Sequence, residues 1–334
     1  MPRCTRYQRR EDQPVSAPSG RFAPPAPSRS GRFAPPPPSR SGRFAPSPTS
    51  DLHLGNLRTA LLAWLFARSA GLDFVVRIED LDQQRVAAAP AVARRQLDDL
   101  ESLGLDWDGE VVRQSDRLEL YQDAAAGLDT YECFCTRREI ARASQAPHGR
   151  HRPYPGTCAH LTDAERSRLR SDRPAAIRVR AGGVTSTVHD RHAGEVTAPV
   201  DDFVLFRNDL TPAYNLAVVV DDAAQRVVQV CRGDDLLESA PRQAWLARTL
   251  GKQVPGYFHV GLALNASGKR LAKRDGAVTL ADLRAAGASP ADVMVRLCRS
   301  LGFPEATTPR QLLAGALAGE IDLSGPRTWE PWVV

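Results

Sequence analysis

A short segment around residue 53 combines residue types that bind phosphate. His53 and Asn56 flank Gly55 at the start of a stretch whose leucines recur every three to four residues, at Leu54, Leu57, Leu61, Leu62 and Leu65. This spacing predicts an amphipathic helix, and the free N–H groups of its first turn can bind phosphate oxygens. Gly55 lets a ligand approach the backbone closely. The alternative is an ordinary capped helix that carries His53 on its surface.

A second candidate for phosphate binding lies near residue 270. Gly and Ser precede clustered cations in the segment 265–276, which holds two of the three lysines of the chain, Lys269 and Lys273. This composition predicts a mobile loop that could close over phosphates. A lone basic run is usually a solvated surface, so the prediction depends on the phosphate-binding segment upstream.

Cysteines indicate a possible metal site, because Cys133, Cys135 and Cys158 cluster while the other three of the six cysteines are scattered. Three thiolates can supply three ligands of a tetrahedral Zn²⁺. General coordination chemistry favours a histidine as the fourth ligand, and the candidates are Tyr154, His148, His151 and His160. We expect a structural zinc, because no general base sits beside the cluster, and no disulfide scaffold in a chain of this length. The alternative is three incidental buried cysteines.

The elements that must position these residues follow an α/β pattern. A buried strand over 73–79 ends at Glu79, and an amphipathic helix covers 90–103. Strand, helix, strand and helix form a Rossmann-like start. No Gly-x-Gly-x-x-Gly follows the first strand, which argues against a dehydrogenase.

Later segments predict an insertion and then a return to the core. Antiparallel strands of the insertion are expected at 176–180, 184–189 and 202–207. The core continues with a helix or strand over 211–222, strands over 227–230 and 257–264, and helices over 241–250, 290–301 and 310–318. The expected organisation is a tail over 1–42, a catalytic core over 43–128 and 208–280, a cysteine-containing insertion over 129–207, and a short helical C-terminal segment over 281–334.

Charge and composition limit the partners. The 334 residues carry a net charge of +5, but residues 1–42 hold eight Arg and two acidic residues, a net of +6, so the rest sums to 5 − 6 = −1. The basic excess therefore lies in the Pro/Ser/Arg-rich tail, which contains an eleven-residue repeat at 20–30 and 31–41 and is expected to be disordered. No apolar run reaches the roughly 18 residues of a membrane span, so we expect a cytoplasmic protein.

The order of these motifs resembles the glutamyl-tRNA synthetase family of class I aminoacyl-tRNA synthetases. His-Leu-Gly-Asn after Pro-Ser-Pro-Thr resembles the HIGH motif, and Arg270-Leu-Ala-Lys-Arg274 resembles the KMSKS loop. The likeness covers nearly all of 43–280 and implies a Rossmann-like core with a zinc-containing insertion, and ATP with Mg²⁺ as substrate. Three positions depart from the pattern, where Ser50 replaces Gly, Arg270 replaces Lys and Ala272 replaces Ser. Arg270 keeps the charge, so we expect activity to be retained.

The resemblance also implies roles for individual residues. The glutamate contacts that it implies are Arg43, Phe44, Ala45, Pro46, Ser47, Glu79, Tyr214 and Arg232. Its ATP contacts are His53, Gly55, Asn56, Arg270 and Lys273, of which His53, Asn56 and Lys273 are expected to be catalytic. Glu79 suits the ammonium group of the amino acid, and Arg43 or Arg232 suits its side-chain carboxylate. For the metal site, the resemblance implies Tyr154 as the fourth zinc ligand.

The length of the chain after the predicted phosphate loop bears on which tRNA the resemblance implies. Only 58 residues follow Gly276 (334 − 276), too few for the anticodon-binding region of a full glutamyl-tRNA synthetase. The chain therefore resembles the branch of the family that attaches glutamate to the queuosine base of tRNA(Asp). The alternatives are a shortened synthetase that charges tRNA(Glu) and an inactive tRNA-binding paralogue. The oligomeric state is left open.

Overall fold

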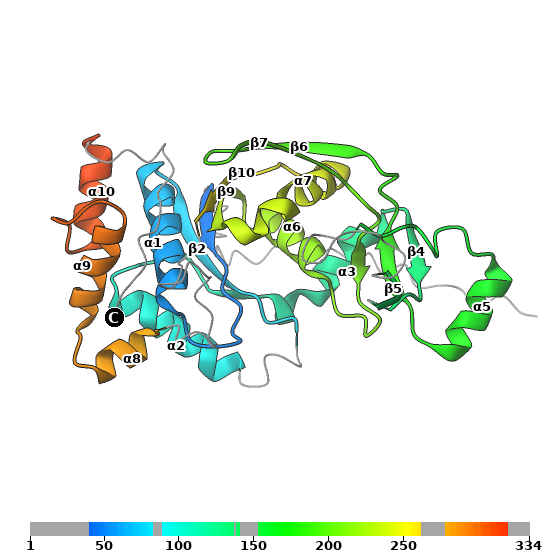
Figure 1. Cartoon of the computed structure of the whole chain (residues 1–334), viewed down its shortest axis with the longest axis horizontal. Helices are drawn as coiled ribbons and strands as arrows, with labels where there is room; N and C mark the ends of the chain where they lie inside the picture. Colours follow the sequence, from blue (N-terminus) through cyan, green and yellow to red (C-terminus); the bar gives the residue numbers. More distant parts are fainter. Residues whose placement is uncertain (1–39, 83–88, 137, 141–152, 262–277, 320–334) are drawn as a thin grey trace, which may run out of the picture. The chain divides into compact units, whose positions relative to one another are not determined.

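The computed structural model describes residues 40–82, 89–136, 138–140, 153–261 and 278–319. Contacts divide the chain into Met1–Pro37 and Pro38–Val334, and every described residue belongs to the second unit. Its centre is a seven-stranded sheet with the strand order β3-β2-β1-β9-β10-β6-β7 (Figure 1). The bounds are β1 Ser41–Phe44, β2 Asp73–Ile78, β3 Val112–Arg113, β6 Thr185–Asp190, β7 Gly194–Pro199, β9 Val227–Gly233 and β10 Gly256–Val260. All neighbours pair in parallel except β6 and β7. The prediction of a Rossmann-like α/β core is confirmed.

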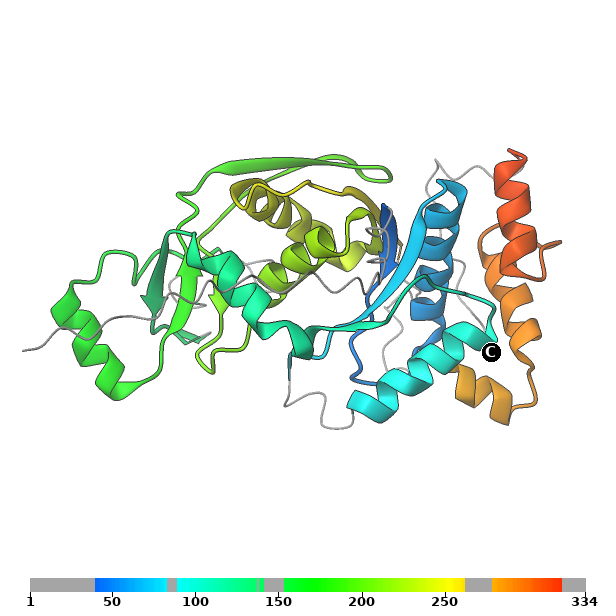
Figure 2. The same cartoon turned by 180° about the vertical axis from the view of Figure 1, so that it is seen from behind.

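The helix α1, Leu54–Ser69, packs against β1 and β9 and is buried on nearly all sides. Its leucine periodicity accounts for one buried face. The other face is covered by C-terminal helices, because α10, Pro309–Leu317, packs directly on α1 and shares one hydrophobic core with it. Both views show α1 between the sheet and the helices α9, Pro290–Ser300, and α10 (Figures 1 and 2). The C-terminal segment thus completes the core of the sheet layer.

Close packing of α1 on β1 requires a residue without a side chain at position 42. A Cβ added to Gly42 would lie 2.8 Å from the Cβ of Ala67 and 3.0 Å from Oε1 of Gln229. The first distance is shorter than carbon atoms tolerate, so a larger residue would push the helix away from the strand. The first strand also begins at Ser41, two residues before the predicted start of the core at Arg43.

Three further helices pack against one another in a second group. The ambiguous apolar stretch 211–222 forms a helix, α6, Tyr214–Ala224, that packs on α7, Ala240–Thr249, and α3, Leu118–Ala126. The remaining elements around the core are α2 Ala89–Ser102, α8 Leu280–Ala285, and the 3₁₀ turns η1 Gln114–Arg117 and η2 Asp234–Ser239. Among the described residues, no helix is long and apolar enough to cross a membrane.

A separate three-stranded antiparallel sheet carries the cysteines. It consists of β4 Thr130–Cys133, β5 Ala176–Val179 and β8 Val204–Phe206, and α5 Asp163–Asp172 starts beside it at a capping box on Thr162. The strand predicted at 184–189 does not join this sheet. It forms β6, which pairs with β7 and extends the main sheet through the pairing of Asp190 with Tyr257. Alternating burial predicted a strand there, but it cannot specify which sheet the strand joins.

Candidate active site

The predicted glutamate-binding segment leaves β1 and is fastened to the end of β2. The backbone N–H of Glu79 donates to the carbonyl of Pro46 at 2.9 Å, and the hydroxyl of Ser47 donates to the carbonyl of Glu79 at 3.0 Å. Phe44 and Pro46 are buried, Ala45 is half-buried and Ser47 is exposed. The segment therefore passes over the carboxyl ends of two parallel strands, which is where α/β sheets bind ligands.

Beneath this segment lies a buried network of charges. The guanidinium of Arg77, fully buried on β2, donates to Asp222 at 2.7 Å, to Gln225 at 2.9 Å and to Glu79 at 3.3 Å. The buried Arg43 donates to the same Asp222 oxygen from β1, at 3.3 Å. Burial alone would raise the pKa of Asp222, but the charges of Arg43 and Arg77 outweigh it and lower that pKa. The network therefore joins β1, β2 and α6 through ionised groups.

Asp221 extends the network toward α3. Its carboxylate accepts hydrogen bonds from Arg117 at 2.7 Å, from the hydroxyl of Tyr121 at 2.8 Å and from Gln114 at 2.8 Å. Burial, together with the neighbouring charge of Asp221, raises the pKa of Tyr121. The hydroxyl of Tyr121 is therefore a fixed donor, which locks α3 onto α6.

Glu79 differs electrostatically from the aspartates beside it. Burial raises its pKa above the ordinary value of 4.5, while the charges of Arg77 and Arg43 oppose the shift. A buried carboxylate gains most from a neighbouring cation, because water does not compensate its charge. Glu79 can therefore bind an ammonium group.

Arg232, at the end of β9, is a buried cation held by neutral groups. It is 4% exposed and donates to Nε2 of His259 at 2.8 Å, to Oε1 of Gln243 at 2.8 Å, to the hydroxyl of Tyr214 at 3.2 Å and to the carbonyl of Leu236 at 3.2 Å. Within the described ranges, no carboxylate forms an ion pair with it. A ligand carboxylate would supply the missing charge, and the bidentate geometry of Arg suits that group.

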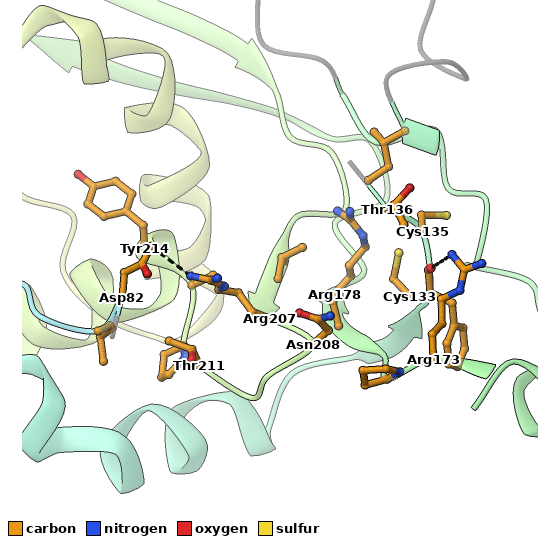
Figure 3. A pocket seen from close by; sticks show the side chains of 18 of the residues that line it. Asp82, Cys133, Cys135, Thr136, Arg173, Arg178, Arg207, Asn208, Thr211 and Tyr214 are labelled. Carbon is orange, nitrogen blue, oxygen red and sulfur yellow. Dashed lines mark hydrogen bonds and ion pairs between the residues drawn. The ribbon is translucent and has the colours of Figure 1, made fainter. Parts of the chain in front are cut away.

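A large cavity connects the predicted glutamate site with the cysteines. Its volume is about 1450 Å³, and its wall includes Ser47, Glu79 and Tyr214 of the predicted glutamate site as well as Cys133 and Cys135. The cationic side chains along it are Arg173, Arg178 and Arg207. Figure 3 shows Arg207 between Tyr214 and the cysteines, with an ion pair to Asp82 at 3.4 Å. The cavity can accept an extended anionic ligand.

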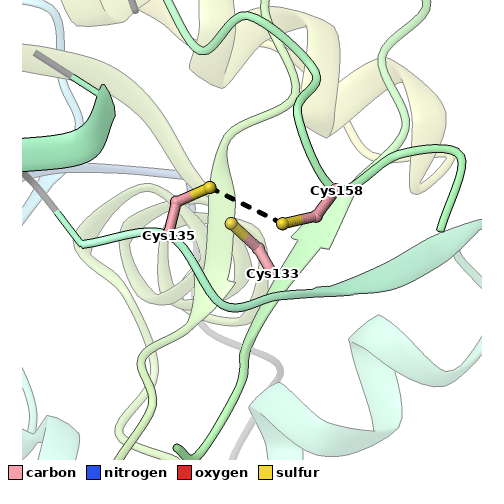
Figure 4. Close-up of side chains that lie close together, drawn as sticks. All are labelled: Cys133, Cys135 and Cys158. Carbon is pink, nitrogen blue, oxygen red and sulfur yellow. Dashed lines mark hydrogen bonds between the residues drawn. The ribbon is translucent and has the colours of Figure 1, made fainter. Parts of the chain in front are cut away.

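The three predicted cysteines meet, and their sulfur atoms all lie within 4.8 Å of one another (Figure 4). Sγ of Cys135 is 3.5 Å from Sγ of Cys158. The hydroxyl of Tyr154 is 3.4 Å from Sγ of Cys133 and 3.8 Å from Sγ of Cys135. Ligands of a tetrahedral zinc at about 2.0–2.3 Å are separated by about 3.5–3.8 Å. The four side chains therefore fit such an ion.

Surrounding groups favour this donor set. The guanidinium of Arg178 lies 3.7 Å from the centre of the Tyr154 ring. Burial opposes ionisation of Cys133, but hydrogen bonds with Tyr154 and Arg178 outweigh it and lower the pKa of its thiol. Of the predicted histidine ligands, His160 does not belong to the cysteine group in the part of the chain that the structure describes. His148 and His151 lie outside the described residues.

The predicted phosphate-binding residues form the start of α1. His53 is the N-cap, and its Nδ1 accepts from the backbone N–H of Asn56 at 3.2 Å, while Oδ1 of Asn56 accepts from the N–H of His53 at 3.3 Å. Gly55, in the first turn, is buried. The helix is therefore capped by His53, as the alternative interpretation of the sequence predicts. The Nε2 atom of His53 takes no part in the capping box. Capping and phosphate binding use different atoms, so one does not exclude the other.

The predicted phosphate loop, including Arg270, Ala272 and Lys273, lies outside the described residues. Its flanks are described, and both meet α1. The carbonyl of Gly261 accepts from Arg58 at 3.3 Å, and the carbonyl of Val278 accepts from the N–H of Leu54 at 3.1 Å. The residues that flank the predicted loop therefore both contact α1, the helix that His53 caps.

Sequence reasoning missed several residues that support the site, namely Arg77, Asp190, Asp221, Asp222, Gln243 and His259. Two signals could have found part of this set. Arg77 interrupts the apolar run Val-Val-Arg-Ile, and Asp221-Asp222 directly follows the apolar run Leu-Ala-Val-Val-Val. A charge inside a segment that must be buried requires a partner of opposite charge. Neither signal identifies which residues form the pair.

The chain resembles known proteins over most of its length. Residues 41–315 match the family described as tRNA synthetases class I (E and Q), catalytic domain. The glutamyl-Q tRNA(Asp) synthetase of Nocardia farcinica is 56% identical over 292 residues, which cover 86% of this chain and 90% of the relative. The protein of the same name from Cutibacterium acnes is 59% identical over 266 residues, which cover 79% of this chain and 77% of that relative. The solved glutamate tRNA ligase of Elizabethkingia meningosepticum, in complex with its amino acid, has a TM-score of 0.71 at 26% identity, covering 88% of this chain and 67% of that one.

Proposed function

This chain belongs to the class I tRNA synthetases of the E and Q type, and on that premise we propose that it activates L-glutamate with ATP and transfers the glutamyl group to queuosine in the anticodon of tRNA(Asp). In the first step, an oxygen of the α-carboxylate of glutamate attacks the α-phosphorus of ATP and expels pyrophosphate. In the second, a hydroxyl of the queuosine cyclopentenediol attacks the glutamyl carbonyl and AMP leaves. The observation that carries the assignment of glutamate is Arg232, a buried cation whose described partners are all neutral.

The amino acid is held by opposite charges at its two ends. Glu79 binds the ammonium group, and Arg232 with Tyr214 binds the side-chain carboxylate. Arg43 is already ion-paired with Asp222, so its role is to balance the network beneath the Phe44–Ser47 segment. The partners of the two arginines support this division of roles. Arg43 has a carboxylate partner, whereas Arg232 has none among the described residues.

ATP is held at the first turn of α1. His53 and Asn56 donate from side-chain nitrogens, Gly55 gives the phosphates access to the backbone, and Arg270 and Lys273 contribute charge from the loop. Stabilisation of charge on the phosphates and the leaving pyrophosphate is what this reaction requires. Mg²⁺, bound with ATP, adds to the same stabilisation. The proposal is supported by the contacts of α1 with Gly261 and Val278, which flank the loop.

Cys133, Cys135, Tyr154 and Cys158 hold one structural zinc. The support is the spacing of their donor atoms, which fits a tetrahedral ion. A zinc held by these four residues would link β4 to the segment around Cys158. It would thereby stiffen the wall of the cavity near Arg173 and Arg178.

A charging experiment with radiolabelled glutamate and three RNAs identifies the tRNA that accepts the glutamyl group. We expect labelling of tRNA(Asp) that contains queuosine, and none of the same tRNA with guanosine or of tRNA(Glu). The cavity arginines suit an RNA backbone, but they do not discriminate between tRNAs. Labelling of the 3′ end of tRNA(Glu) would show a shortened glutamyl-tRNA synthetase, a reading that the likeness to a glutamate tRNA ligase also allows. Absence of ATP–pyrophosphate exchange would show an inactive paralogue.

A further inference from the structure

A buried chain of three side chains ends at Arg232. Nε of Arg232 donates to Nε2 of His259 at 2.8 Å, and Nδ1 of His259 lies 2.7 Å from Oδ2 of Asp190. The three residues are 4%, 1% and 0% exposed and come from β9, β10 and β6. The assignment of glutamate uses only the contact between Arg232 and His259, so the role of Asp190 and of the orientation of the His259 ring is a separate question.

The contacts determine where the imidazole carries its proton. Arginine has no acceptor, so Nε2 of His259 must accept from Arg232, and the ring proton must lie on Nδ1 and point to Asp190. Asp190 is held as an acceptor by three backbone N–H groups, those of His192 at 2.9 Å, Ala193 at 2.7 Å and His259 at 3.0 Å. Burial, reinforced by the charge of Arg232, lowers the pKa of His259. The ring is therefore a neutral link between two ions.

This link restrains the guanidinium of Arg232. Four acceptors take N–H groups from it, at His259, Gln243, Tyr214 and Leu236. Arginine has five N–H donors. One of them has no acceptor among the described residues and can bind a ligand. Tyr214 accepts from Arg232 and keeps its own hydroxyl proton to donate. Together these two donors match the two oxygens of a carboxylate, whereas a carboxamide would direct an NH₂ group at one of them.

We propose that His259 and Asp190 are positioning residues that orient Arg232 so that the site selects glutamate over glutamine. The inference rests on the proposed binding of the glutamate side chain by Arg232. It assigns a function to the β6–β7 hairpin, because Asp190 connects the hairpin turn to the amino acid site. Selectivity of this kind depends on a buried group that only the correct substrate can satisfy.

The test compares His259→Asn with His259→Gln by ATP–pyrophosphate exchange. Glutamine is long enough to place its carbonyl oxygen where Nε2 accepts from Arg232, whereas asparagine reaches only the position of Nδ1 and keeps the contact with Asp190. We expect His259→Asn to raise the KM for glutamate about tenfold or more, with the KM for ATP unchanged and the preference for glutamate over glutamine reduced by a similar factor. His259→Gln keeps the acceptor for Arg232 but loses the contact with Asp190, so it should raise the KM for glutamate by only about threefold. Equal effects of the two variants on the KM for glutamate would overturn the proposal.

Two further measurements separate the possible failures. Arg232→Ala should raise the KM for glutamate more than His259→Asn does; if it does not raise it at all, the proposed role of Arg232 fails. If Arg232→Ala raises the KM but His259→Asn does not, only the positioning role fails. In the wild-type chain, ¹⁵N chemical shifts of the His259 ring near pH 7 should show a neutral ring protonated at Nδ1. A proton on Nε2 would overturn the proposal even if neither variant folds.

Discussion

At the residue scale, the site depends on charges that are buried before any ligand binds. Arg77 has no exposed surface and contacts Asp222 and Glu79. Burial of ions costs several kcal/mol each unless partners compensate, so each member of this network fixes the ionisation of the others. Glu79 is the exception, because burial raises its pKa despite the charges of Arg77 and Arg43. Its negative charge is therefore not fully compensated by the network. The burial that raises the pKa of Glu79 also favours a cationic ligand beside its carboxylate.

The first prediction concerns the pH dependence of glutamate activation. Glu79 must be ionised to bind an ammonium group, and its pKa is raised from 4.5. As pH falls through that raised pKa, kcat/KM for glutamate should fall, approaching tenfold per pH unit, while the KM for ATP stays constant. Pyrophosphate exchange between pH 5 and 8 measures both. A flat profile, or an unchanged acidic limb in Glu79→Gln, would show that another group titrates.

Removing Arg77 should destabilise the fold much more than removing an arginine that forms a pair of the same length but is only partly buried. Arg77→Met leaves the buried carboxylate of Asp222 without its 2.7 Å partner, at an expected cost of about 3–5 kcal/mol. The matched control is Arg117→Met, which breaks a 2.7 Å pair with Asp221 at a side chain that is 23% exposed; it should cost less. Urea unfolding measures both free energies. Similar losses would contradict the idea that burial decides the effect.

At the element scale, the small sheet around the cysteines is where local structure and metal binding meet. β4 ends at Cys133, and the segment after it places Cys135 near Cys158 and Tyr154. The backbone N–H of Cys158 donates to the hydroxyl of Tyr154 at 2.8 Å, so the loop is already folded around the donor set. The sheet has few buried residues of its own, and an ion would add stability that its core does not supply.

Metal analysis of the purified protein should give about one zinc per chain. Cys135→Ser removes one thiolate and should lower the zinc content and the unfolding temperature together. Cys298→Ser is the control, because Cys298 is buried in α9 within the main core and belongs to no cysteine group in the described segments. It should lower stability without lowering zinc. Retention of zinc by Cys135→Ser would exclude the proposed ligand set.

At the scale of the whole molecule, the structure depends on contacts between distant parts of the sequence. Ser41 donates from its backbone to Arg226 and from its hydroxyl to Gln225, which are 3.1 and 2.9 Å away. The strand it begins lies between β2 and β9 at the centre of the sheet. The first strand of the sheet therefore begins at Ser41, and residues 1–39 contain no predicted site residue.

Deletion of residues 1–39 should leave glutamate activation within about twofold of the full chain, because these residues contain no predicted site residue and their composition predicts disorder. Deletion of residues 1–42 removes half of β1, including Gly42, and should abolish folding or activity. Circular dichroism and pyrophosphate exchange on both truncated chains provide the comparison. Loss of activity in the shorter deletion would show that the repeats take part in the reaction.

The sequence by itself determined the local chemistry. The leucine spacing of α1, the apolar run ending at Glu79 and the clustered cysteines each predicted an element or group that the structure contains, because periodicity and ligand type are properties of short segments. Tertiary structure alone decided the pairings. That β6 joins the main sheet, that Arg77 meets Asp222 and that Asp190 reaches Arg232 through His259 all depend on strands far apart in the chain. A segment's pattern shows that it must be buried, whereas its partner is chosen by the packing of the whole fold.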